Sequence, residues 1–294
     1  MNLVTRLDFD GLLSAAMIYD REHIADISFT SPQTMEEGGL LDILQRGDII
    51  AHLPFHIDAG FWFHNHDASH IDPKSLLSVK GKYGKAPSTA RQVFDYYQSP
   101  ALKRYELLVQ VADKIGTANY TRDEVLEPKG WIMVSYTLDP RFSHDESYGM
   151  LILNSIKAGK SAEEILALPP VARRVELYKK DEERYLKVLN DSTKLDGNVI
   201  VTDLRGPVGA PRGNRFVVFV RFDQGNVHVR LDSLGGFRTR VSVSKSIFNR
   251  TCNINIGALM EEFGGGGMEG AGTCIFGRRV AEERIATVIK KLKA

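Results

Sequence analysis

The sequence predicts an α/β fold with two domains. In the first half, short apolar segments alternate with helical patterns, which favours a mostly parallel sheet with flanking helices. After residue 196 the chain becomes rich in β-branched residues, which indicates a smaller C-terminal α/β domain. The expected strands of the first half are 2–7, 24–30, 48–53 and 60–63, and its expected helices are 12–21, 35–45, 88–97 and 101–115.

A charged helical stretch at residues 171–189 separates the two regions. It follows Leu168-Pro169-Pro170, and its apolar residues fall near one stripe, so we interpret it as a linker helix. We therefore place the first domain, with this helix, at 1–190 and the second domain at 196–294. In the second domain we expect strands at 199–201, 216–220, 227–231 and 273–276, a turn at 223–226 between the middle two, and a helix at 256–263.

Composition narrows the class of protein. A chain of 294 residues with 43% apolar residues can bury a large core, and its net charge of +1 gives no global field for nucleic acid or an anionic membrane. It has only Cys252 and Cys274 and no apolar run that could cross a bilayer. We expect a cytoplasmic protein with no membrane partner.

The segment Arg6-Leu7-Asp8-Phe9-Asp10-Gly11 sets two carboxylates two residues apart where an expected strand ends and a helix follows. Side chains at this spacing in extended backbone point the same way, and open α/β sheets bind ligands at such strand ends. The alternative is that Asp8 and Asp10 only cap the helix and turn the chain.

Histidines gather in a second segment. Five of the eight lie between residues 48 and 70, and two expected strands end at His52 and His64. Imidazole and carboxylate groups hold divalent transition-metal ions, which activate water near neutral pH. His52, His64 and His66 are the candidates by position, whereas His56 and His70 are more typical of surface loops.

A third segment holds four consecutive glycines, Gly264 to Gly267, between a helical pattern and an apolar strand. Bare backbone N–H groups there could form a nest for a phosphate or carboxylate. A flexible linker is the alternative interpretation.

These segments, with Ala86-Pro87-Ser88-Thr89-Ala90 and Val111-Ala112-Asp113-Lys114-Ile115, occur in the order found in the DHH phosphoesterase superfamily. The chain resembles it over nearly its whole length and is most similar to bacterial proteins described as exopolyphosphatase-related. The resemblance implies a metal-binding N-terminal domain facing a substrate-binding C-terminal domain across a cleft. It also implies a divalent ion, manganese or magnesium, and a phosphate-containing small molecule or short oligonucleotide as substrate, and it leaves a homodimer open.

Carried over by position, the resemblance makes Asp8, Asp10 and Asp113 metal ligands. The family's opening His is Arg6 here, its bridging Asp is His52, and the motif that names the family is His64-Asn65-His66 or Asn65-His66-Asp67. The glycine run ends in Met268 instead of His, and Ser242-Val243-Ser244-Lys245 lacks the family's Arg. The predicted site comprises the metal ligands Asp8, Asp10, His52, His64 and Asp113, the catalytic residues His66 and Arg6, and the substrate-binding residues Gly264, Gly265, Gly266, Gly267 and Lys245.

These departures change the expected chemistry. The guanidinium of Arg6 could neutralise the carboxylates in place of one ion, and neutral His52 cannot bridge two cations as a carboxylate does. The acids and imidazoles suffice for one ion, and they suit zinc, manganese or iron better than magnesium.

Three functions remain open. The first is hydrolysis of a phosphate ester or anhydride by a divalent metal, and the second is a non-hydrolytic relative that binds phosphate or a nucleotide. The third is a nucleic-acid-binding module, for which the second domain offers many arginines. These are Arg205, Arg212, Arg215, Arg221, Arg230, Arg238, Arg240 and Arg250, together with Lys245.

Overall fold

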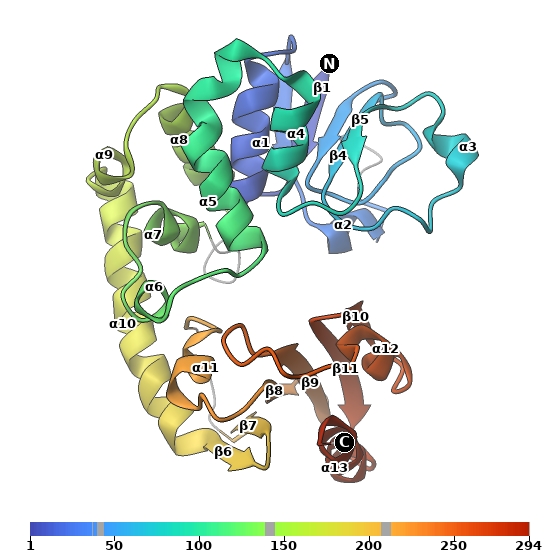
Figure 1. Ribbon diagram of the computed structural model, residues 1–294, viewed down its shortest axis with the longest axis vertical. Coiled ribbons are helices and arrows are strands. Elements are labelled where there is room, and N and C mark those ends of the chain that lie inside the picture. The colour runs from blue at the N-terminus through green and yellow to red at the C-terminus, as the bar shows by residue number, and fades with distance from the viewer. Residues whose placement is uncertain (37, 40–43, 139–144, 207–212, 294) are drawn as a thin grey trace. The chain divides into compact units, whose positions relative to one another are not determined.

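The computed structural model describes residues 1–36, 38–39, 44–138, 145–206 and 213–293. The chain forms two compact units (Figure 1). The first comprises Met1–Tyr120 and Pro128–Glu176, and the second comprises Thr121–Glu127 and Leu177–Ala294. Each unit combines one sheet with helices, so the predicted α/β class is confirmed.

The first unit contains a five-stranded sheet in the order β2-β1-β3-β4-β5, and every pair in it is parallel. Because parallel strands end at the same edge, the residues that follow β1, β3 and β4 come close together. The strands are β1 (Asn2–Thr5), β2 (Asp26–Phe29), β3 (Ile49–Ala51), β4 (Phe61–His64) and β5 (Lys80–Tyr83).

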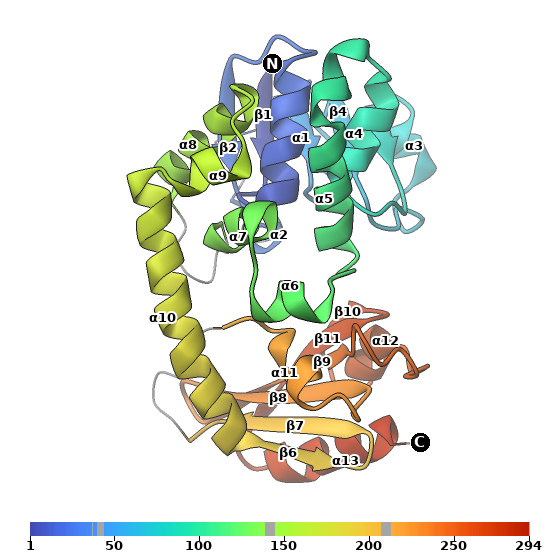
Figure 2. The same ribbon diagram turned by 60° about the vertical axis from the view of Figure 1, so that its left-hand side comes forward.

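Helices of the first unit share one apolar core with a face of this sheet: α1 (Phe9–Tyr19) and α4 (Thr89–Tyr97) contact its strands, and α5 (Glu106–Gly116) and α8 (Glu146–Lys157) pack against these two helices. Figure 2 shows α1, α4 and α5 side by side. The apolar stripes of these helices, α8 included, bury Leu12, Val93, Val109 and Ile152 completely. The opposite face packs loops and short helices around Trp62. The remaining helices that lie wholly in this unit are α2 (Pro32–Glu36), α3 (Pro73–Leu76), η1 (Pro100–Tyr105), α7 (Gly130–Thr137) and α9 (Ala162–Leu166).

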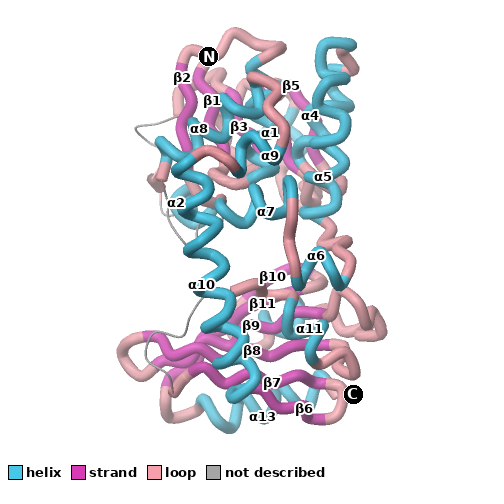
Figure 3. The backbone as a smooth tube through the Cα atoms, turned by 90° about the vertical axis from the view of Figure 1, so that its left-hand side faces the viewer, coloured by secondary structure: helices cyan, strands magenta, loops and turns pink. Residues whose placement is uncertain are grey.

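The second unit contains a six-stranded mixed sheet in the order β10-β11-β9-β8-β7-β6, drawn in magenta in Figure 3. The strands are β6 (Thr193–Asp196), β7 (Val199–Leu204), β8 (Val227–Leu234), β9 (Arg238–Lys245), β10 (Gly266–Met268) and β11 (Ala271–Gly277). Helices α12 (Ile256–Glu261) and α13 (Ala281–Leu292) share one apolar core with this sheet, and α6 (Arg122–Leu126) also belongs to this unit. The long helix α10 (Pro169–Ser192) starts in the first unit and ends in the second.

The strand expected at 216–220 is wrong, because this segment forms the helix α11 (Val217–Arg221). Its start is held by Asn214, whose Oδ1 accepts the N–H of Phe216 at 3.0 Å. Val217, Val218 and Phe219 are all buried, so packing on several sides overrides the β-propensity of the sequence. The turn expected at 223–226 therefore follows a helix and leads into β8.

The helix expected at 35–45 is not matched: α2 ends at Glu36, and residues 37 and 40–43 lie outside the described part of the chain. The described glycines Gly38 and Gly39 form a turn, with Gly38 at a φ of 81°. In the described ranges, no helix combines the length and the apolar character needed to span a membrane.

Candidate functional site

Asp8 and Asp10 have different roles at the start of α1. Asp8 caps the helix, because its Oδ1 accepts the N–H of Gly11 at 2.9 Å, as the capping alternative predicted. Asp10 is 7% exposed and turns toward another helix: its two oxygens accept the N–H groups of Thr89 and Ala90 at 2.9 and 2.7 Å. The extended spacing that we expected is wrong, because β1 ends at Thr5 and α1 already begins at Phe9.

His52, which follows β3, joins the two carboxylates. Its Nε2 lies 3.3 Å from Oδ2 of Asp8, and its Nδ1 lies 3.3 Å from Oδ2 of Asp10. Nδ1 also lies 2.9 Å from the hydroxyl of Thr89, which itself donates to Oδ1 of Asn65 at 2.9 Å. Since that hydroxyl uses its proton on Asn65, it accepts from His52, and Nδ1 carries a proton.

Burial and neighbouring charges shift the pKa values of His52, Asp8 and Asp10. Burial opposes the charged imidazole, but the carboxylates of Asp8 and Asp10 outweigh it and raise the pKa of His52 to about 9. Burial acts against ionised Asp8 in the same way, yet His52 and Arg6 hold its pKa well below the usual range. Burial dominates at Asp10 and raises the pKa of that carboxyl. His52 is therefore a cation near neutral pH.

Arg6 completes the cluster from the loop after β1. Its Nε lies 3.0 Å from Oδ2 of Asp8, and 41% of its side chain is exposed. Its two terminal nitrogens make no hydrogen bond or ion pair with the residues that the structure describes. One edge of the guanidinium is thus anchored, and the side chain is partly exposed to solvent.

His64 and His66 lie at the end of β4. The ring of His64 stacks on Trp62 at a centroid distance of 5.2 Å and lies 5.1 Å from the ring of His66. Burial lowers the pKa of His64 to about 3, and burial together with His52 lowers the pKa of His66. Both imidazoles are neutral at pH 7, and Nδ1 of His64 is buried without a hydrogen-bond partner in the part of the chain that is described.

Asp113 on α5 is tied to α4. The guanidinium of Arg91 donates to its Oδ2 from Nε at 3.0 Å and from Nη2 at 2.6 Å, and Ser88 donates to its Oδ1 at 2.6 Å. The N-terminal turn of α4 therefore holds Asp113 and Asp10 at once. The structure brings Arg6, Asp8, Asp10 and His52 into direct contact, and among the described residues Asp113 is linked to them through α4.

The sequence analysis missed Arg91, and it gave no role to Thr89 and Asn65, although both lie in segments that carry the family resemblance. The segment 86–90 resembles the start of a helix, and Ser88 at the cap position is the sequence signal for the polar contacts there. Nothing in the sequence singled out Arg91, because its partner Asp113 is 22 residues away along the chain.

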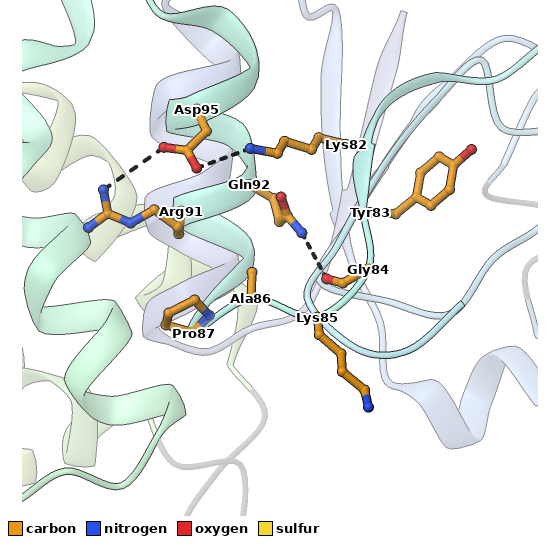
Figure 4. A pocket seen from close by; sticks show the side chains of 9 residues that line it. All are labelled: Lys82, Tyr83, Gly84, Lys85, Ala86, Pro87, Arg91, Gln92 and Asp95. Carbon is orange, nitrogen blue, oxygen red and sulfur yellow. Dashed lines mark hydrogen bonds and ion pairs between the residues drawn. The ribbon is translucent and has the colours of Figure 1, made fainter. Parts of the chain in front are cut away.

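A pocket of about 490 Å³ opens beside α4 (Figure 4). Two of its cationic side chains contact one acid of the lining: Lys82 lies 3.0 Å and Arg91 4.0 Å from the carboxylate of Asp95. The lining residues are Lys82, Tyr83, Gly84, Lys85, Ala86, Pro87, Arg91, Gln92 and Asp95.

The glycine run lies in the second unit and is part of a sheet. Gly264 has a φ of 75°, and the run continues into β10, which pairs with β11. A Cβ on Gly265 would lie 2.1 Å from the carbonyl oxygen of Thr273, whereas Gly266 has open space. The flexible-linker interpretation is therefore wrong. Lys245 of the same unit lies 3.4 Å from Glu269.

Several arginines of the second unit are paired with acids. Arg205 contacts Asp203 and Glu282, and Arg230 and Arg240 both contact Asp232. Arg212 lies outside the described residues. Paired arginines offer little free charge to a nucleic-acid backbone, so these contacts do not favour the nucleic-acid-binding interpretation.

The donor set does not fit the two-ion centre that the family resemblance implies. Both imidazole nitrogens of His52 face hydrogen-bond acceptors, and the carboxylate of Asp113 is engaged by Ser88 and Arg91. Within the described residues, no three His, Cys, Asp or Glu side chains are arranged to hold a metal ion.

Comparison with solved structures places the chain in a family. It is 31% identical to PggH, a pGpG-specific phosphodiesterase from Vibrio cholerae, with a TM-score of 0.81 over 99% of this chain and 98% of that protein. It shares its fold with the RecJ protein of Thermus thermophilus in complex with Mn²⁺, at 12% identity, a TM-score of 0.58, and coverage of 99% of this chain and 51% of RecJ.

A third similar structure is the DHH domain of a protein described as a member of a family of ribosomal proteins. It is 16% identical, with a TM-score of 0.52 and coverage of 99% of this chain and 86% of that one. No protein-family model and no curated protein matches the sequence. The similarity to PggH extends over the whole chain at this level of identity, and the chain therefore belongs to the DHH phosphoesterase superfamily.

Proposed function

We propose that this protein is a phosphodiesterase that hydrolyses a short linear dinucleotide such as pGpG to mononucleotides. The observation that carries the proposal is the similarity to PggH, which extends over 99% of the chain. The cluster of Arg6, Asp8, Asp10 and His52 at the carboxyl edge of the sheet supports it, since α/β sheets bind ligands at this edge.

Two groups of the first unit fit the chemistry of hydrolysis. Arg6 presents its terminal nitrogens as a fork that matches two phosphate oxygens, while Asp8 holds its Nε in place. His66 is neutral, because burial and His52 lower its pKa, so it can accept a proton from water. In the proposed reaction, the water oxygen bonds to phosphorus, the P–O bond to one ribose breaks, and the proton held by His66 passes to the leaving oxygen.

The glycine run and Lys245 belong to the same proposal as phosphate-binding groups of the second unit. Gly266 leaves open space beside its backbone, and the ammonium of Lys245 pairs with the exposed carboxylate of Glu269 in the described part of the chain. A phosphate group is the kind of ligand that suits such donors.

A second candidate function is binding of the same dinucleotide without hydrolysis. The observation that favours it is the Arg91–Asp113 pair, which engages a carboxylate at a family ligand position. The ligand is the same in both candidates, so product analysis separates them.

The test is a substrate panel on the purified full chain. pGpG, pApA, a cyclic dinucleotide and a short polyphosphate are each incubated with Mn²⁺, Mg²⁺, Zn²⁺ or a chelator, and the products are separated by chromatography. Conversion of a linear dinucleotide to mononucleotides supports the phosphodiesterase. Calorimetric binding of pGpG without any product supports the second candidate, and neither binding nor product contradicts both.

A further inference from the structure

The carboxylates of Asp8 and Asp10 are held by donors that keep their protons at all ordinary pH values. Arg6 Nε lies 3.0 Å from Asp8, and the backbone N–H groups of Thr89 and Ala90 bind Asp10 at 2.9 and 2.7 Å. A guanidinium and a peptide N–H do not deprotonate in proteins. A metal ion would have to displace these donors or share the oxygens with them.

Both carboxylate oxygens of Asp113 accept hydrogen bonds from side chains of the α4 segment. Its Oδ2 accepts both Nε and Nη2 of Arg91, at 3.0 and 2.6 Å, and its Oδ1 accepts the hydroxyl of Ser88 at 2.6 Å. The side chain of Asp113 is only 20% exposed, so the positive charge of Arg91 is poorly screened by water there. A divalent cation that approached this carboxylate would be repelled by the guanidinium.

Helix α4 makes these contacts difficult to rearrange. The hydroxyl of Ser88 caps α4 by accepting the N–H of Arg91 at 3.0 Å, while it donates to Asp113. The next two residues supply the N–H groups that bind Asp10. Rotating Asp113 toward an ion would therefore break a helix cap as well as a bidentate ion pair.

We infer that the guanidinium groups of Arg6 and Arg91 neutralise the carboxylates of Asp8 and Asp113, and that the folded site holds no divalent ion. The family resemblance assigns this neutralisation to divalent ions. This inference concerns the charge balance of the site and goes beyond the proposed function. It stands whether the protein hydrolyses pGpG or only binds it.

The test is a Mn²⁺ titration in the absence of any nucleotide, by calorimetry and by electron paramagnetic resonance of the free ion. The wild type is compared with Arg6→His, Arg91→Gln and the double variant, with Arg46→Gln as the control for loss of one exposed arginine of the same unit. Circular dichroism and thermal unfolding establish that each variant is folded.

We expect less than about 0.1 equivalent of Mn²⁺ on the wild type and on Arg46→Gln, and tighter binding by about 10- to 100-fold in the double variant. Wild-type protein that binds one or more equivalents with a micromolar Kd, and loses them in Asp8→Asn, overturns the inference. A folded double variant that gains no Mn²⁺ also overturns it, because the arginines then do not exclude the ion. If the double variant does not fold, the wild-type titration alone decides. Because no nucleotide is present, the result is independent of the proposed hydrolysis.

Discussion

Asp10 and Thr89 are 79 residues apart in the chain, and the buried carboxylate of one accepts the backbone N–H of the other at 2.9 Å. Ala90 binds the second oxygen at 2.7 Å, so the negative charge lies at the N-terminal end of α4. A helix N-terminus stabilises an anion through its free N–H groups and its dipole. The protein thus uses its own carboxylate where a ligand anion could have bound, and this contact fixes α1 against α4.

Replacing Asp10 by Asn should destabilise the fold, because the amide turns one acceptor into a donor that faces a backbone N–H. We expect the free energy of unfolding to fall by about 2–3 kcal/mol, as for a lost hydrogen bond to a charged group. Urea unfolding measures it. Asp95→Asn is the control. Asp95 contacts Lys82 at the surface, so this substitution should lower the free energy of unfolding by less than about 1 kcal/mol. Equal effects of the two variants would show that the Asp10 contact is not stabilising.

Arg6→Lys should lower kcat/KM for pGpG by about 100-fold, because an ammonium keeps the charge but loses the fork that binds two phosphate oxygens. Steady-state kinetics on the purified variant gives the value, and Arg46→Lys on the same unit serves as the control. Unchanged kcat/KM in Arg6→Lys would mean that the terminal nitrogens of Arg6 do not touch the substrate.

Two adjacent glycines should respond differently to the same change. Gly265→Ala should destabilise the second unit by about 1–3 kcal/mol, because its Cβ would lie 2.1 Å from the carbonyl oxygen of Thr273. Gly266→Ala has open space and should change stability by no more than about 0.5 kcal/mol. If the run binds phosphate, Gly266→Ala should weaken pGpG binding in calorimetry while the fold stays intact. Unchanged affinity would make the run a structural feature only.

The second unit should be sensitive to acid through His228. Burial, with a smaller contribution from Arg230, lowers the pKa of this imidazole to about 3, while the unfolded chain binds the proton near pH 6.5. Between about pH 3 and pH 6.5 the unfolded chain binds one proton more than the folded chain. The free energy of unfolding therefore falls on acidification by up to about 1.4 kcal/mol per pH unit, and His228 does not affect it above pH 7.

His228→Asn should remove this slope. Circular dichroism follows the unfolding of both units, whereas the fluorescence of Trp62 and Trp131 follows the first unit, which contains both tryptophans. The dichroism change that the fluorescence does not report is therefore the unfolding of the second unit. A variant that keeps the full pH dependence of the wild-type second unit would show that another group takes up the proton.

Local pattern was sufficient to predict much of the fold. Segments with a clear period, such as the strand at β3 and the helix at α4, formed close to the expected residues because their neighbours in sequence determine their buried faces. The segment 217–221 failed for the opposite reason. Its residues are apolar on nearly every side, so periodicity cannot separate a buried helix from a strand, and packing in the second unit decides.

The candidate site was predictable where it depends on strand ends. Asp8, Asp10 and His52 follow β1 and β3, and a parallel sheet brings such residues together whatever their distance in the chain. The pairing of Asp113 with Arg91 depends on how α5 packs against α4, and the sequence contains no local signal for that contact. Tertiary packing therefore decides whether a carboxylate is free to bind a ligand or is already neutralised by a neighbouring side chain.

The most direct test of the central claim is the reaction of pGpG in H₂¹⁸O, analysed by liquid chromatography and mass spectrometry. The proposed phosphodiesterase should produce two GMP molecules for each pGpG, of which one carries a single ¹⁸O from the attacking water, and the rate should fall in Arg6→Lys. Intact pGpG after prolonged incubation, or GMP without ¹⁸O, would contradict the claim that this chain hydrolyses a dinucleotide at the Arg6–Asp8 cluster.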